Sequence, residues 1–208
     1  MVTAKEVMEV SKIIPVISVD SANEMLHLAE ALIKGGVSIF EITLRTPAAL
    51  AAIEAVAREF PHAMTGAGTV INAQTFQAVY DAGAKFAISP GLTKELAIFA
   101  QNFHMPLLPG VATASEIMNG LAYGFKEFKL FPATVVGGIP ALKAFGGPFA
   151  DVMFCPTGGI NASNARSFLE LPNVACIGGS WIVPSNLIAE KKFDEITRLT
   201  KEAVELLS

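Results

Sequence analysis

The chain has 208 residues, of which 52% are hydrophobic and 16% are charged, and its formal net charge at pH 7 is −4. This length and apolar content suffice for one large core, so we expect a single domain over residues 1–208. The 15 Lys and Arg residues are scattered along the chain, which argues against a nucleic-acid surface. No apolar run approaches the length of a membrane span, and the first residues lack a signal-like region, so we expect no membrane association. The two cysteines, Cys155 and Cys176, stand in apolar segments, which is typical of buried thiols in a reducing, cytoplasmic environment.

Eight short apolar runs without clean alternation recur along the chain and predict strands that are covered on both faces, as in parallel sheets. They are residues 13–17, 37–42, 63–67, 86–88, 107–108, 128–131, 152–154 and 174–177. Stretches with helical period separate them. Some of these stretches begin with the pattern of a capping box, as at residues 21–24 and 113–116, and end near glycines, as at Gly83 and Gly124.

The residues that follow the eight predicted strands recur at intervals of 20 to 27 positions. Eight strand–helix units of such even length, joined by right-handed crossovers, predict an α/β fold that closes into a (β/α)8 TIM barrel. Residues 3–12 and 192–207 predict two further helices outside the eight units. We expect the N-terminal one to cover one end of the barrel.

Lys129 lies inside the apolar run of residues 128–131. If this strand is buried, loss of hydration disfavours the ammonium and favours the neutral amine, which is a nucleophile that condenses with ketones. The alternative is that Lys129 ends an edge strand and extends its ammonium into water, as most lysines do.

Active sites of this fold lie at the carboxyl ends of the strands. Alternation along the second strand places Glu41, Thr43 and Arg45 on one side, with Glu41 deeper. A carboxylate inside a barrel is costly without a partner or a function. The alternative is an ordinary ion pair between Glu41 and Arg45 at the end of the strand.

Loops after other strands offer groups that bind anions. Thr69 follows two glycines after the third strand, and glycine pairs follow the seventh strand, at residues 158–159, and the eighth, at residues 178–179. Glycine-rich loops at these last two strands are where barrels commonly bind phosphate through backbone N–H groups. Pro90 predicts a rigid turn that forms a wall. The three histidines are scattered without paired spacing, so we predict no metal site.

Five motifs together resemble one family: EITLR at 41–45, GAGT at 66–69, FKLFPA at 128–133, CPTGGI at 155–160 and GGSW at 178–181. The chain resembles the aldolases for 2-keto-3-deoxy-6-phosphogluconate (KDPG) and 4-hydroxy-2-oxoglutarate (KHG) over nearly its whole length. The resemblance implies a class I aldolase on a (β/α)8 barrel without metal or other cofactor, a homotrimer of the Entner–Doudoroff pathway. Its reaction splits KDPG into pyruvate and glyceraldehyde 3-phosphate, and KHG into pyruvate and glyoxylate.

By the same resemblance, Lys129 forms the Schiff base and Glu41 is the general acid and base. Residues of the keto-acid pocket are Arg45 and Thr69, which hold the pyruvate carboxylate, together with Pro90, Phe131 and Thr157. The phosphate is received by Gly158, Gly159, Gly179 and Ser180.

Two positions depart from relatives: Ser18 ends the first strand where some carry a basic residue, and Thr134 replaces a frequent acid. Substrate preference is therefore open, and the sister aldolase for 2-keto-3-deoxy-6-phosphogalactonate is an alternative. A metal-dependent sugar-phosphate epimerase and a non-catalytic sugar-phosphate sensor are others, disfavoured by the missing ligand pattern and by the presence of both Lys129 and Glu41.

Overall fold

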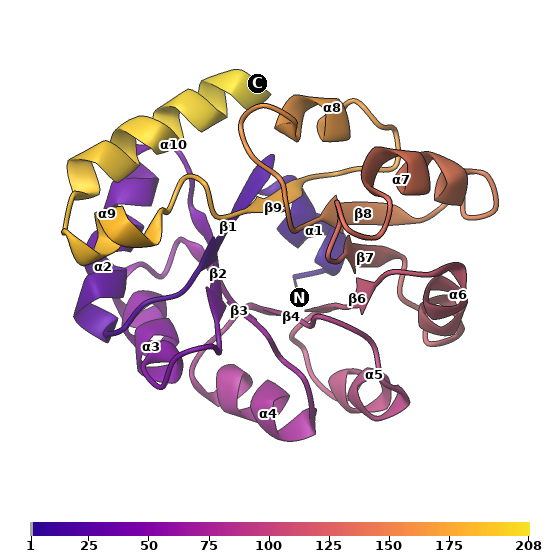
Figure 1. The fold of residues 1–208 in the computed structure, drawn as a ribbon. Coiled ribbons are helices and arrows are strands. Elements are labelled where there is room, and N and C mark those ends of the chain that lie inside the picture. The colour runs from indigo at the N-terminus through magenta and orange to yellow at the C-terminus, as the bar shows by residue number, and fades with distance from the viewer. Residues whose placement is uncertain (1) are drawn as a thin grey trace.

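A computed structural model describes residues 2–208, in which parallel strands form a ring and helices surround it (Figure 1). The strands are β1 (Ile13–Ile17), β2 (Ile39–Thr43), β3 (Met64–Gly68), β4 (Phe86–Ile88), β5 (Leu107–Leu108), β6 (Gly110–Val111), β7 (Glu127–Leu130), β8 (Met153–Pro156) and β9 (Ile177–Gly179). The helices are α1 (Ala4–Glu9), α2 (Ala22–Lys34), α3 (Ala49–Glu59), α4 (Ala73–Asp81), α5 (Lys94–Ala100), α6 (Ala114–Ala122), α7 (Gly138–Gly146), α8 (Ala165–Leu169), α9 (Ser185–Ala189) and α10 (Phe193–Leu207). The predicted (β/α)8 barrel is confirmed.

The ring consists of a six-stranded sheet in the order β5-β4-β3-β2-β1-β9 and a three-stranded sheet in the order β6-β7-β8. The predicted fifth strand is divided into β5 and β6 by Pro109, which has no N–H for the ladder, although its carbonyl still accepts from Lys129 N at 2.9 Å. At the other junction, isolated bridges join β8 and its end to the β9 region, at Phe154–Val174 and Thr157–Gly178. The two sheets together therefore close the barrel.

The predicted eighth strand at residues 174–177 is misplaced, because β9 begins at Ile177. Between the two bridges, the β8 side advances three residues (154 to 157) and the β9 side advances four (174 to 178). This extra residue is a bulge that interrupts the ladder after Val174.

The two helices predicted outside the eight units, α1 and α10, lie at different places on the barrel. Residues of α1 lie beside the amino ends of the strands, where Met8 and Ile13 line one cavity and Ala4 and Glu127 line another. The expectation that α1 covers one end of the barrel is thus confirmed. In contrast, α10 contacts α2, α8 and α9 and occupies a place in the outer ring (Figure 1). The helices α8 and α9 that it contacts have only five residues each.

Helix starts follow the predicted caps, with one variation. Thr113 and Glu116 form the reciprocal capping box, whereas Ser21 accepts from Glu24 N but the Glu24 carboxylate accepts from Asp20 N instead. Gly83 and Gly124 adopt positive φ angles of 87° and 84° after helices α4 and α6, as the predicted stops require.

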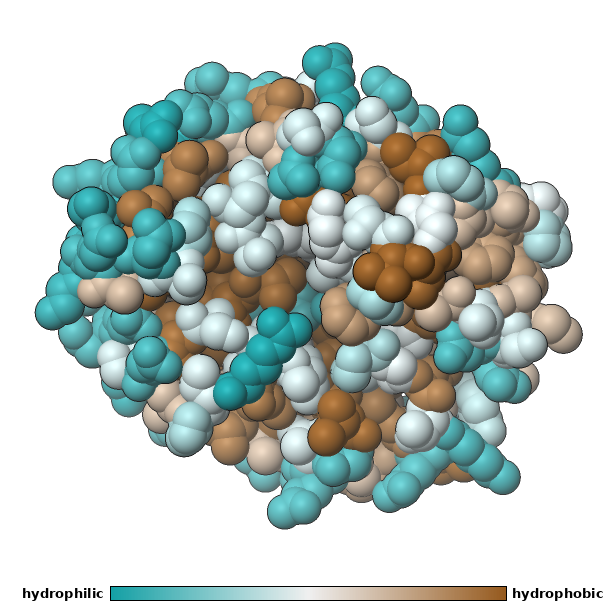
Figure 2. All heavy atoms as spheres, in the orientation of Figure 1, coloured by the Kyte–Doolittle hydropathy of each residue, from teal (hydrophilic) through white to brown (hydrophobic). Residues whose placement is uncertain are grey.

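Buried apolar side chains form one continuous cluster, and every strand contributes at least one residue to it. The outer edge of the molecule carries mostly hydrophilic side chains, and paler and apolar ones appear toward the middle of the face (Figure 2). Within residues 2–208, no helix is both long and apolar enough to cross a membrane.

Candidate active site

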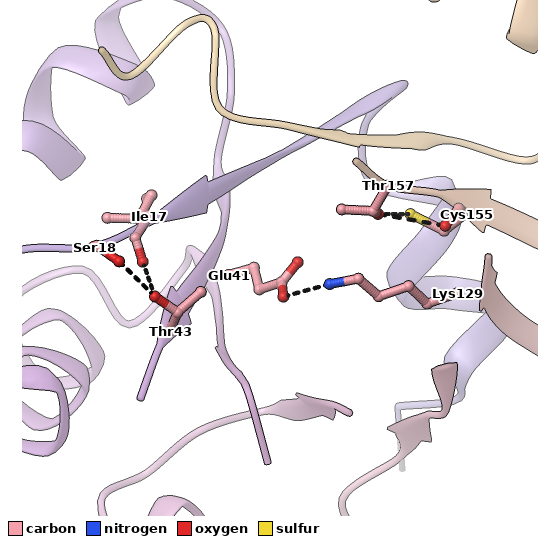
Figure 3. Close-up of polar contacts among 7 residues, drawn as sticks. All are labelled: Ile17, Ser18, Glu41, Thr43, Lys129, Cys155 and Thr157. Atoms are coloured by element: carbon pink, nitrogen blue, oxygen red, sulfur yellow. Dashed lines mark hydrogen bonds and ion pairs between the residues drawn. The ribbon is translucent and has the colours of Figure 1, made fainter. Parts of the chain in front are cut away.

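Lys129 and Glu41 meet inside the barrel (Figure 3). Lys129 projects from β7 and Glu41 from β2, and Lys129 Nζ donates a hydrogen bond to Glu41 Oε1 at 2.9 Å. Their side chains are only 6% and 2% exposed. A buried ion pair is a weak source of stability because both groups lose hydration, so its presence calls for a functional explanation.

This geometry rules out both alternative interpretations of the two residues. β7 is paired with β6 on one side and β8 on the other, so Lys129 neither lies on an edge strand nor extends into water. Glu41 pairs with Lys129 and not with Arg45, whose side chain is exposed and forms no ion pair among the described residues.

Gly68 makes room for the Glu41 carboxylate on the neighbouring strand. A Cβ atom at position 68 would lie 2.3 Å from Glu41 Oε1 and 2.8 Å from its Cγ. Gly66 likewise leaves room for the ring of Phe86. The glycines of β3 thus act as spacers for neighbouring side chains inside the barrel.

An aromatic ring adjoins the lysine. Lys129 Nζ lies 5.2 Å from the centroid of the Phe131 ring, within the range of a cation–π contact. Phe131 also lines a cavity of about 150 Å³ at the carboxyl ends of the strands. The cavity is lined by Val16, Arg45, Phe131, Thr157, Gly158, Gly159, Ile160, Gly178, Gly179 and Ser180.

Seven of the residues that the sequence singled out are therefore brought together in one cavity. Three others line it without having been assigned a role: Val16, Ile160, and Gly178 of the glycine pair at residues 178–179. Val16 is the register partner of Glu41, so alternation along the first strand was the available signal. Gly178 lies next to Thr157, since a Cβ at position 178 would be 2.2 Å from Thr157 Oγ1.

Besides Lys129 and Glu41, two predicted residues lie outside the lining of this cavity. Thr69 is half-buried directly after β3 and has a φ of 64°, an unusual value for a β-branched residue. Its neighbour Gly68 contacts Glu41. Pro90 is exposed at the end of β4, where its carbonyl group lies against Gly110.

The cavity is lined by unpaired backbone donors. The N–H groups of Gly159 and Ser180 have no hydrogen-bond acceptor within the described part of the chain, and the Gly158 N–H points toward Gly178 across the bridge that joins β8 to β9. Convergent N–H groups of this kind bind anions, and the exposed Arg45 guanidinium adds a positive charge at the same cavity.

The two cysteines lie side by side in the barrel. Counting back two residues from the Thr157–Gly178 bridge places Cys155 opposite Cys176, and both thiols are free and buried. A side-chain hydrogen bond with Cys155, together with burial, raises the pKa of Cys176 well above its usual value. Cys176 is therefore a neutral thiol and a poor nucleophile.

The two departures from relatives have clear structural positions. Thr43 Oγ1 donates to Ile17 O at 2.7 Å and therefore accepts from Ser18 Oγ, which lies 2.8 Å away (Figure 3). Thr134 follows β7 and lies against the loop that carries Gly158 and Gly159.

Neither a metal-binding cluster among the described residues nor a larger cavity at the other end of the barrel competes with this site. Residues 2–208 contain no group of three or more His, Cys, Asp and Glu side chains that could hold a metal ion. A cavity of about 540 Å³ opens at the opposite end of the barrel, near Lys12 and Met153. It lacks an arrangement of the Lys129–Glu41 kind.

Comparison with known proteins agrees with this arrangement. The family model for KDPG and KHG aldolase matches residues 4–199. The KHG/KDPG aldolase of Escherichia coli is 49% identical over 203 residues, covering 98% of this chain and 95% of that protein. The 2-dehydro-3-deoxy-phosphogluconate aldolase of Pseudomonas aeruginosa is 48% identical, covering 94% of this chain and 89% of that protein.

Among solved structures, the KDPG aldolase of Legionella pneumophila is 52% identical and superimposes with a TM-score of 0.94. The match covers 96% of this chain and 97% of that one. That crystal structure holds pyruvate captured at low pH as a covalent carbinolamine intermediate.

A barrel with a buried lysine and carboxylate beside a glycine-lined cavity is the arrangement of a class I aldolase, which acts through a Schiff base. Within that class, the chain belongs to the KDPG and KHG aldolase family.

Proposed function

We propose that the chain cleaves KDPG to pyruvate and glyceraldehyde 3-phosphate, and KHG to pyruvate and glyoxylate, through a Schiff base on Lys129. The observation that carries the proposal is the 2.9 Å contact between Lys129 Nζ and Glu41 Oε1 in the barrel interior. The identities of 45% to 49% to several curated aldolases of these substrates support it.

In the proposed mechanism, Lys129 is the nucleophile and Glu41 transfers the protons. The Lys129 amine adds to the substrate ketone to form a carbinolamine, which loses water to give an iminium ion. Glu41 then accepts the proton of the C4 hydroxyl while the bond between C3 and C4 breaks, and the electron pair passes into an enamine. The aldehyde leaves, the enamine is protonated at C3, and water releases pyruvate from Lys129.

The cavity residues supply binding in this proposal. Arg45 and Thr69 hold the keto-acid carboxylate, Pro90, Phe131 and Thr157 form the walls, and the substrate phosphate binds at the glycine loops. The phosphate-binding residues are Gly158, Gly159, Gly179 and Ser180. The open N–H groups of Gly159 and Ser180 and the nearby guanidinium support this assignment.

The test is borohydride trapping. Incubation of the protein with pyruvate and borohydride should add one reduced-pyruvate increment to the intact mass, and peptide mapping should locate it on Lys129. No increment on folded protein with pyruvate in excess would refute the proposal.

Parallel assays separate the alternatives. Equal or faster cleavage of the phosphogalactonate epimer would make the chain the sister aldolase. Binding of these sugar phosphates without turnover would make it a sensor.

We also propose that the chain is a homotrimer in the cytoplasm. Large exposed apolar side chains, among them Ile71 at 55%, Met118 at 61% and Val135 at 80% exposure, support self-association. The free thiols Cys155 and Cys176 fit a reducing compartment. Sedimentation at three times the chain mass of 21.9 kDa is the expected result, and a monomer would contradict it.

A further inference from the structure

The loop after β7 is joined to the loop after β8 by three hydrogen bonds. Ala133 N donates to Thr157 O at 2.8 Å, and Thr134 N donates to Gly158 O at 3.2 Å. The hydroxyl of Thr134 also donates to Gly158 O, at 3.3 Å. Two successive carbonyl groups of the β8 loop thus point toward the β7 loop.

This arrangement fixes where the N–H groups of the β8 loop point. In a trans peptide unit, the C=O and the next N–H point in opposite directions. The carbonyls of Thr157 and Gly158 face the β7 loop, so the N–H groups of Gly158 and Gly159 face away from it. The Gly159 N–H has no acceptor among the described residues, and both glycines line the cavity.

The β7 loop also occupies the side-chain positions of these glycines. A Cβ at Gly158 would lie 3.2 Å from Pro132 Cα, and one at Gly159 would lie 2.0 Å from Thr134 Oγ1. One face of the glycine pair is therefore covered by the β7 loop, and the other is left for a ligand.

Glycine is the residue for which a reversed peptide is least costly, and Gly158 and Gly159 have φ angles of 105° and 75°. If the peptide between them turned over, a carbonyl oxygen would face the cavity in place of an N–H and would repel an anion. Thr134 opposes this change with two bonds to the same carbonyl oxygen.

From these contacts we infer that Thr134 is a positioning residue for the substrate phosphate. Its hydroxyl holds the peptide between Gly158 and Gly159 with the N–H toward the phosphate monoester. The inference rests on the proposed function for its substrate. It adds a determinant of phosphate affinity that touches neither the reacting carbons nor Lys129.

The test compares Thr134→Val, which keeps the shape and removes the hydroxyl, with Thr134→Ser, which keeps the hydroxyl. Val135→Ala is the matched control, because the Val135 side chain is 80% exposed in the same loop. Each protein is assayed with KDPG, with unphosphorylated KHG, and with inorganic phosphate as a competitive inhibitor.

Thr134→Val should raise the KM for KDPG and the Ki for inorganic phosphate by about two- to fivefold, because one long, neutral hydrogen bond is lost. The kcat values and the KM for KHG should stay unchanged, and Thr134→Ser and Val135→Ala should match the unaltered protein. Equal changes with both substrates would show a general structural role and would overturn the inference. No change with KDPG and phosphate would overturn it as well.

A binding measurement separates this inference from the aldolase proposal. Inorganic phosphate should raise the melting temperature of the unaltered protein and raise that of Thr134→Val less at the same concentration. If neither substrate is cleaved, the proposed function fails, but this comparison still decides the role of Thr134. Equal phosphate shifts in the two proteins, or none in either, would overturn that role.

Discussion

Replacing Gly68 with alanine moves the Glu41 carboxylate without changing any group that reacts. The added Cβ would lie 2.3 Å from Glu41 Oε1, whereas ordinary contact begins at 3.4 Å, so the carboxylate must shift by about 1 Å. Oε1 is the atom that bonds Lys129 at 2.9 Å. A shift of this size away from Nζ takes the contact beyond hydrogen-bond range.

The expected result is a kcat lower by about 100-fold, the usual cost of misplacing a catalytic group by about 1 Å. This corresponds to about 2.7 kcal/mol of activation free energy. Pyruvate release from KDPG, followed with lactate dehydrogenase and NADH, measures the change. The Lys129 amine is still present, so borohydride should still trap pyruvate.

Gly91→Ala is the matched control, because a Cβ at position 91 meets no atom within 4 Å. Its kcat should equal that of the unaltered chain. A Gly68→Ala protein that loses less than about fivefold, or about 1 kcal/mol, would refute the argument that the Glu41 position limits the reaction.

Four further substitutions test the site. Lys129→Ala should abolish both cleavage and borohydride trapping, and substantial remaining activity would disprove the Schiff base. Glu41→Gln should still form the pyruvate adduct but lower kcat by about 10²- to 10⁴-fold, as loss of a general base does; near-normal turnover would count against its role. Arg45→Ala should raise the KM for the keto acid more than it lowers kcat, so an unchanged KM would contradict the carboxylate assignment. Lys129→Met should destabilise the fold by about 3 to 5 kcal/mol, because Glu41 is left buried without a partner, and Glu41→Gln in the same chain should recover much of this in thermal unfolding.

The barrel could be predicted because each strand is buried on both faces and therefore leaves a short apolar run. The ends of a strand were less predictable where they depend on pairing with a strand that is distant in the sequence. The position of β9 follows from the bulge opposite β8, and nothing in residues 174–177 alone shows that an extra residue lies between two bridges. The place of α10 in the ring depends on its contacts with α2, α8 and α9, which are distant or separate elements.

The cavity residues could be found because they follow the strands at the end where barrels bind ligands. The partner of Glu41 could not be derived from spacing. Arg45 was the nearby basic residue on the same side of the strand, whereas Lys129 lies 88 positions away and reaches Glu41 only across the closed barrel. The support that Thr134 gives to the glycine loop depends on contacts between two loops, for which the sequence carries no local signal.

The pairing of Lys129 with Glu41 joins the two sheets of the barrel, since β7 belongs to the three-stranded sheet and β2 to the six-stranded one. We expect this contact to form only when both sheets are in place, because it joins residues 88 positions apart and removes both charges from water. A partly folded chain therefore has an ordinary hydrated lysine at position 129. The chain acquires its paired lysine and carboxylate at the moment of barrel closure, so the recovery of pyruvate trapping after dilution from denaturant should follow the last folding step, later than the recovery of helical structure.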